Sequence, residues 1–146
     1  MVDILRLSQY VINHTPRALS HLELQRVLFL IRLDYNLQNK KDIFEEMIVK
    51  QIGVIYEPVY DKFLKRYNLD LPKTGDNIAL PNDLRLSVNR VFYILRNKTF
   101  WNWYNFGSLE NIAEILKDND LLHEKKYILS KRELRILVKE YRKRFW

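Results

Sequence analysis

Apolar residues recur every three or four positions along most of this chain, the spacing that places them on one face of a helix. The pattern predicts helices that begin near Asp3, Ser20, Pro58, Asn82 or Asp83, Ser108 and Ser130. Ser20 and Ser130 are each followed three residues later by a glutamate, so each pair can form a capping box that satisfies two backbone N–H groups. We therefore expect a mainly helical, all-α fold of six or seven helices.

The second predicted helix differs from the others, because apolar residues cover most of its circumference. They are Leu22, Leu24, Val27, Leu28, Phe29, Leu30, Ile31 and Leu33. A helix with such a pattern is packed by neighbours on several sides. We predict that it is the central helix, that it ends at about Tyr35, and that residues 36–42 form a polar connection.

The middle of the chain is less regular. Residues 43–55 are rich in β-branched side chains around Gly53, and they fit either one short β-hairpin near residues 48–55 or a turn of helix. The helix that begins at Pro58 should bury one face, formed by Val59, Tyr60, Phe63, Leu64 and Tyr67. Residues 71–77 are dense in turn-forming residues and predict a loop. The pattern then places Arg85, Arg90 and Arg96 on the polar side of the next helix.

Composition narrows the classes of protein. A chain of 146 residues with 47% hydrophobic residues predicts one domain, 1–146, with its own core. The absence of cysteine excludes disulfides, thiolate metal sites and thiol nucleophiles. No signal-peptide pattern and no run of about 18 uncharged apolar residues occurs, so we expect a cytoplasmic protein without a membrane span.

The net charge of +7 lies at one end of the chain. Residues 1–124 hold equal numbers of basic and acidic side chains, whereas residues 125–146 hold nine Lys/Arg and two Glu. The predicted helix 131–146 is amphipathic: Leu134, Leu137, Val138, Tyr141 and Phe145 form its apolar stripe. Its candidate partner-binding cations are Arg132, Arg135, Lys139, Arg142 and Lys143. Such a face suits an acidic protein surface, phosphate groups or a membrane interface, or it is simply solvated.

Five aromatic residues occur within positions 100–106. Helical spacing favours ordinary core packing for this run, but contact with a partner and stacking on bases are alternatives. We keep Trp101 and Trp103 as candidate partner contacts. For base stacking the run lacks a basic residue, and only Lys98 is close in sequence.

The sequence offers no pattern typical of catalysis. The three histidines, His14, His21 and His123, do not have metal-ligand spacing, and the three glycines form no phosphate-binding loop. Glu45 and Glu46 are adjacent and so point in different directions. We expect no enzymatic activity, no metal and no cofactor.

The segment 24–60 resembles the Panacea domain, also known as the SocA-like or GepA-like domain. The matching residues are Leu24, Gln25, Leu28, Phe29, Phe44, Ile48, Gly53, Val59 and Tyr60. The family pattern has a tryptophan-containing run where this chain has Val49-Lys50-Gln51-Ile52, which is one residue shorter, and a proline where this chain has Val54. The later order of helices also fits that family.

The resemblance implies a protein-binding function in a toxin–antitoxin system or a phage-encoded counter-defence system. A member of this family binds a cognate toxin or another protein partner, and it either blocks that partner or, in the SocA branch, presents it to a cellular protease. The alternative is a nucleic-acid-binding regulator that uses the basic C-terminal helix. Residues 108–116 look like the first helix of a helix-turn-helix motif, but the following spacer of about 13 residues is longer than usual.

Overall fold

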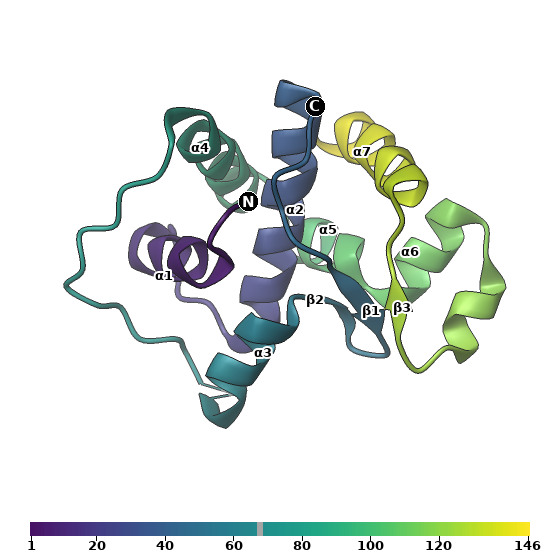
Figure 1. The fold of residues 1–146 in the computed structure, drawn as a ribbon, viewed down its shortest axis with the longest axis horizontal. Coiled ribbons are helices and arrows are strands. Elements are labelled where there is room, and N and C mark those ends of the chain that lie inside the picture. Colours follow the sequence, from purple (N-terminus) through teal and green to yellow (C-terminus); the bar gives the residue numbers. More distant parts are fainter. Residues whose placement is uncertain (67–68) are drawn as a thin grey trace.

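The computed structural model describes residues 1–66 and 69–146, and within them it confirms the mainly helical fold (Figure 1). The α-helices are α1 Ile4–His14, α2 His21–Asn39, α3 Glu57–Phe63, α4 Asn82–Asn97, α5 Phe100–Tyr104, α6 Leu109–Leu116 and α7 Lys131–Phe145. The strands are β1 Ile48–Lys50, β2 Gly53–Ile55 and β3 Tyr127–Ile128. Short 3-10 turns are η1 Leu64–Arg66, η2 Asn105–Gly107 and η3 Asn119–His123.

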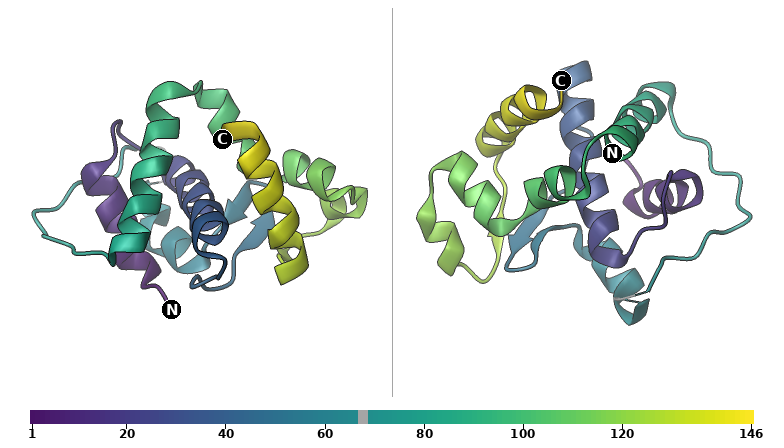
Figure 2. Two further views of the ribbon diagram at one scale, coloured as in Figure 1. Left: turned by 90° about the horizontal axis from the view of Figure 1, so that it is seen from above. Right: turned by 180° about the vertical axis from the view of Figure 1, so that it is seen from behind.

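Helix α2 runs through the middle of the molecule, as predicted, and the other elements surround it (Figures 1 and 2). It packs chiefly against α4 and α7. Its residues from Leu24 to Tyr35 are all buried, including four polar ones. The buried apolar residues of the described segments form one cluster that draws on every α-helix.

Local capping explains most helix starts. The predicted boxes Ser20–Glu23 and Ser130–Glu133 both form, and Asp3 and Ser108 accept hydrogen bonds from the first backbone N–H groups of α1 and α6. The predicted cap at Asn82 or Asp83 is wrong, because α4 includes both residues and begins after Pro81.

Helix α2 continues to Asn39, four residues beyond the predicted end. The Nδ2 atoms of Asn36 and Asn39 donate to the carbonyls of Arg32 and Tyr35, so the polar segment extends the helix. Lys40 then ends it in the left-handed conformation, with φ of 57°.

The hairpin alternative for residues 48–55 is confirmed, but the sheet has a third strand that the sequence did not predict. The strands are antiparallel in the order β2-β1-β3, and Ile48 of β1 lies opposite both Ile55 of β2 and Ile128 of β3. Strand β3 is only two residues long and shows no alternating pattern. It forms because α7 brings the preceding residues beside β1.

Helix α3 is followed by η1, so the face predicted from Pro58 is only partly helical. Val59 and Phe63 are buried, whereas Leu64 is exposed. Tyr67, which was predicted to continue this face, lies outside the described residues. The predicted loop 71–77 is irregular, and Thr74 of the loop accepts a hydrogen bond from Asn13 of α1. Among the helices that are described, none is long and apolar enough to cross a membrane.

A buried arginine of α2 joins the hairpin to the aromatic segment. Arg26 donates from Nε to the carbonyl of Tyr104 (3.1 Å) and from Nη2 to the carbonyl of Ile52 (2.8 Å). Gly53 lies against its guanidinium with φ of 99°, a conformation that L side chains rarely adopt. A Cβ at Gly53 would lie 2.1 Å from Arg26 Nη1 and 2.5 Å from the carbonyl oxygen of Gly107. Arg26 therefore requires glycine at position 53.

We predict that Gly53→Ala lowers the free energy of unfolding by about 2–4 kcal/mol, because it combines backbone strain with overlap on Arg26 and Gly107. Urea unfolding followed by circular dichroism measures the change. The matched control is Gly75→Ala, because a Cβ there meets no heavy atom within 4 Å. Equal stability of the two variants would contradict this role of Gly53.

Candidate functional site

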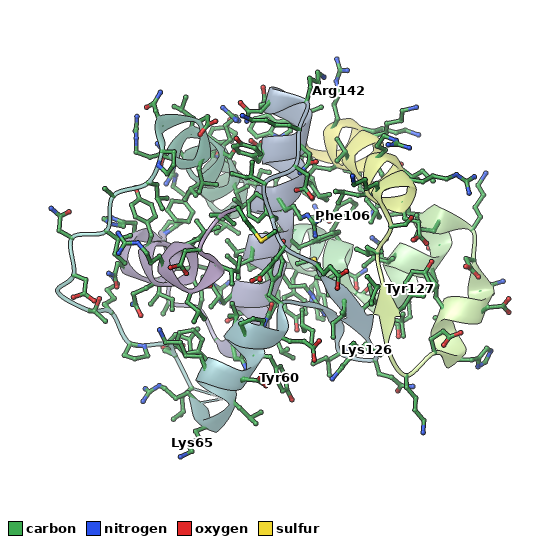
Figure 3. The ribbon with its side chains drawn as sticks, viewed as in Figure 1. Tyr60, Lys65, Phe106, Lys126, Tyr127 and Arg142 are labelled. Carbon is green, nitrogen blue, oxygen red and sulfur yellow. The ribbon has the colours of Figure 1, made fainter. Side chains whose placement is uncertain are left out.

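The start of α7 is fixed by hydrogen bonds on both sides of Glu133. Ser130 N donates to the Glu133 carboxylate (2.9 Å), Glu133 N donates to the Ser130 hydroxyl (3.2 Å), and the Tyr127 hydroxyl also donates to that carboxylate. Burial would raise the pKa of Glu133, but these hydrogen bonds hold it below its ordinary value. The hydrogen bond to Glu133 raises the pKa of Tyr127 to about 12. In Figure 3, Tyr127 lies on β3, below α7.

The five predicted partner-binding cations of α7 share one exposed face, which we call the basic stripe: Arg132, Arg135, Lys139, Arg142 and Lys143. The face exists because Leu134, Leu137, Tyr141 and Phe145 are buried on the opposite side. Within residues 1–66 and 69–146 none of the five forms an ion pair. Figure 3 shows Arg142 at the outer end of the helix. The stripe is about 16 Å long and carries five positive charges, of which Arg132 lies close enough to Glu133 to help lower the pKa of that carboxyl.

A buried carboxylate on α2 holds the far end of α7. Asp34 is fully buried, and it accepts hydrogen bonds from Arg90 Nε of α4 (2.8 Å) and from the Tyr141 hydroxyl of α7 (2.7 Å). Trp146 Nε1 donates to the same tyrosine oxygen (3.0 Å). Burial and the neighbouring Asp34 charge both raise the pKa of Tyr141, so its hydroxyl remains a donor. These contacts fix the rotation of α7 and hence the direction of the basic stripe.

The structure separates the two candidate tryptophans. Trp103 is 1% exposed and belongs to the core, so it offers no surface to a partner, whereas Trp101 is 68% exposed. Phe100 stacks on Tyr104 with ring centroids 4.9 Å apart, and Arg17 lies over the Phe100 ring. The core interpretation of this run is therefore correct for most of its rings, and Trp101 is the exception.

Trp101 lies beside a cation that the sequence analysis did not associate with it. Trp101 and Lys98 line a cavity of about 300 Å³ together with Asn102, Asn105, Arg144 and Phe145, and we call this cavity the Trp101 pocket. Arg144 comes from the C-terminal turn of α7, whereas Trp101 and Asn102 belong to α5. Apart from Phe145, the other residues of the pocket are more than 35 positions from Arg144 in sequence, so no local pattern could have indicated the arrangement.

A wider groove of about 840 Å³ lies along β1 and β3. Arg32 and Asp42 line it and form a two-point ion pair, with Nε–Oδ1 and Nη2–Oδ2 distances of 3.2 and 2.6 Å. Burial would raise the pKa of Asp42, but hydrogen bonds from Arg32 and Asn36 lower it. The groove also holds Glu57 paired with Lys126 (2.9 Å). Glu45, Glu46 and Lys131 line it as well, so the groove carries charges of both signs and shows no clear preference for one sign of ligand.

The three histidines do not meet. His21 is buried against Tyr60, with ring centroids 4.9 Å apart, and loss of solvent lowers its pKa. His14 packs on Tyr10 at the end of α1, and His123 is exposed in η3. Across the described part of the chain, no group of three or more His, Asp or Glu side chains is arranged to hold a metal ion.

Eight of the nine residues that carry the family resemblance are buried, and Tyr60 is half-buried. Six of them are buried apolar side chains: Leu24, Leu28, Phe29, Phe44, Ile48 and Val59. Gln25 is buried too, and its amide accepts from Tyr56 N (2.8 Å) and donates to Tyr56 O (3.2 Å), which fixes the junction of β2 and α3. The lack of a side chain at Gly53 leaves room for the Arg26 guanidinium, and the Tyr60 ring packs against the His21 ring.

Sequence reasoning missed the buried polar residues that position the site. Arg90 is half-buried on the polar side of α4, where the sequence placed it, but its pairing with the buried Asp34 was not predicted. Asp34 and Arg26 stand in the most apolar helix, where a charged residue gives a signal only as an interruption of the pattern.

Comparison of the chain with protein-family models, with curated proteins and with solved structures found no match.

We predict that Asp34→Asn destabilises the protein by about 3 kcal/mol, because the change removes the partner of the Arg90 charge and weakens the acceptor of Tyr141. Thermal and urea unfolding measure the effect. The control is Glu57→Gln, which breaks the exposed pair with Lys126 and should leave the unfolding midpoint unchanged. An equally small effect for Asp34→Asn would show that this network does not hold α7.

Proposed function

We propose that the protein is a non-catalytic binding domain that docks on an acidic surface of a partner protein through the basic stripe. More specifically, we propose that the protein is an antitoxin or a phage-encoded counter-defence protein that acts in the cytosol. It neutralises a cognate toxin by covering it or by presenting it to a cellular protease.

The observation that supports the proposal is the set of five exposed cations on one face of a rigidly packed helix. None of the five forms an ion pair within the described residues, so each guanidinium or ammonium group is available to an anionic partner. Three of the five are arginines, whose planar guanidinium groups form two-point hydrogen bonds with carboxylates. Because capping and the Asp34 network already fix α7, docking requires little ordering of the helix.

The class of partner is supported by the resemblance of residues 24–60 to the Panacea domain. The mainly helical fold is compatible with that resemblance. The positions that match the family pattern hold the core together, so they support the scaffold, and the choice of partner is left to surfaces such as the basic stripe.

A second candidate is a nucleic-acid-binding regulator. The same stripe favours it, because guanidinium groups bind phosphates as readily as carboxylates. The two candidates differ in their response to salt. Binding to duplex DNA falls linearly on a log–log scale, with a slope of about 0.9 for each phosphate neutralised.

The test reverses Arg135, Lys139, Arg142 and Lys143 to glutamate together. If the product of a neighbouring gene is toxic when expressed alone, the wild-type protein should rescue growth and the variant should not. With purified proteins, the affinity of the variant for the partner should be lower than that of the wild type by about tenfold or more, because both the electrostatic steering and the ion pairs at the edge of the interface are lost. Circular dichroism should show an unchanged fold, because the four side chains are exposed.

The matched control replaces Lys41, Lys62, Lys65 and Lys73 with glutamate. These lysines are also exposed, and their reversal changes the net charge by the same amount. It should bind like the wild type. Equal loss in both variants would show an effect of net charge alone. Loss of duplex DNA binding, with no effect on any protein partner, would favour the nucleic-acid candidate.

A further inference from the structure

Trp101 is exposed in a way that core packing does not explain. The neighbouring rings of α5 pack inward or on one another, whereas Trp101 remains 68% exposed. Its ring stands at 72° to Phe100 and at 79° to Tyr104. Phe100 and Tyr104 therefore both contact the indole in T-shaped geometry. Most of the indole surface remains open to another flat group.

The cations of the Trp101 pocket lie on two different elements. Lys98 follows α4, and Arg144 comes from α7. Glu140 accepts a hydrogen bond from Arg144 Nε (3.1 Å), and the guanidinium lies over the Phe106 ring at 5.3 Å. These contacts orient the guanidinium, and among the described residues none accepts a hydrogen bond from its terminal amino groups.

We propose that the Trp101 pocket binds one nucleotide unit, either a free nucleotide or one residue of a single strand. The base stacks on the Trp101 indole, and Lys98 and Arg144 hold the phosphate. The side-chain amides of Asn102 and Asn105 supply donors and acceptors for a base edge. A cavity of about 300 Å³ lies at the small end of ligand sites, which suits one nucleotide and not a longer segment.

The combination of side chains favours this ligand over others. An acidic peptide would pair with the two cations but leave the indole uncovered. An apolar peptide would cover the indole but desolvate Lys98, which forms no ion pair among the described residues, and it would leave the terminal amino groups of Arg144 without an acceptor, which is costly. A nucleotide satisfies both, since every base has a π-face and every phosphate is an anion.

This inference goes beyond the proposed function and does not rest on it. Arg144 follows Arg142 by two residues, so the two side chains are about 200° apart around α7. Lys143, at the edge of the basic stripe, is about 100° from Arg144, so the Trp101 pocket lies beside the stripe and Arg142 is the stripe residue that faces away from it.

The experiment titrates the purified full chain with AMP, with inorganic phosphate and with oligothymidylate of about ten nucleotides, and measures binding by calorimetry or by tryptophan fluorescence. Trp101→Ala should weaken binding by about tenfold or more, and Trp101→Phe should retain most of it. Arg144→Gln should weaken binding, whereas its matched control, Arg142→Gln, should leave it unchanged. Both arginines are exposed, so unfolding midpoints should not move.

Comparison of AMP with the oligonucleotide distinguishes a free nucleotide from one residue of a single strand. Saturable binding of AMP that is lost in Trp101→Ala identifies a free nucleotide. Binding of the oligonucleotide alone, with the same loss, identifies a residue of a single strand. The proposal is overturned if neither ligand binds, if phosphate binds as tightly as AMP, or if Arg142→Gln weakens binding as much as Arg144→Gln.

Discussion

A fully buried carboxylate on the central helix is the constraint on which the arrangement of the candidate site depends. Asp34 has no contact with solvent, and an unpaired charge in that position would be strongly destabilising. Arg90 supplies the counter-charge from α4, and Tyr141 supplies a neutral donor from α7. Because three helices must meet at one carboxylate, their relative positions follow from it, and so does the direction of every side chain on the outer face of α7.

Arg26 plays the corresponding role at the other end of α2. Its guanidinium donates hydrogen bonds to the carbonyls of Ile52 and Tyr104. Because the hairpin passes close to this guanidinium, the residue there must be Gly53. The hairpin, the aromatic segment and the central helix thereby become one unit. This explains why Gly53, which contributes to the resemblance with the Panacea domain, is buried and structural; Gln25 has a separate structural role, because it bonds the backbone of Tyr56.

Helix α7 consequently contributes to both of the surfaces that we propose as binding sites. The basic stripe is a row of like charges suited to an extended anionic surface, whereas the Trp101 pocket combines an aromatic face with two cations suited to a small ligand. Both depend on the same burial of Leu134, Leu137, Tyr141 and Phe145.

The sequence by itself determined the elements whose physics is local. Capping boxes at Ser20 and Ser130, helical spacing of apolar residues and the charge of 131–146 act within a few residues, so the helices and the basic face follow from them. Only the tertiary structure decided the rest. Asp34 with Arg90, Arg26 with Gly53, β3 with β1, and Trp101 with Arg144 are pairs far apart in sequence. No local periodicity encodes such pairs, because each depends on how the helices pack around α2.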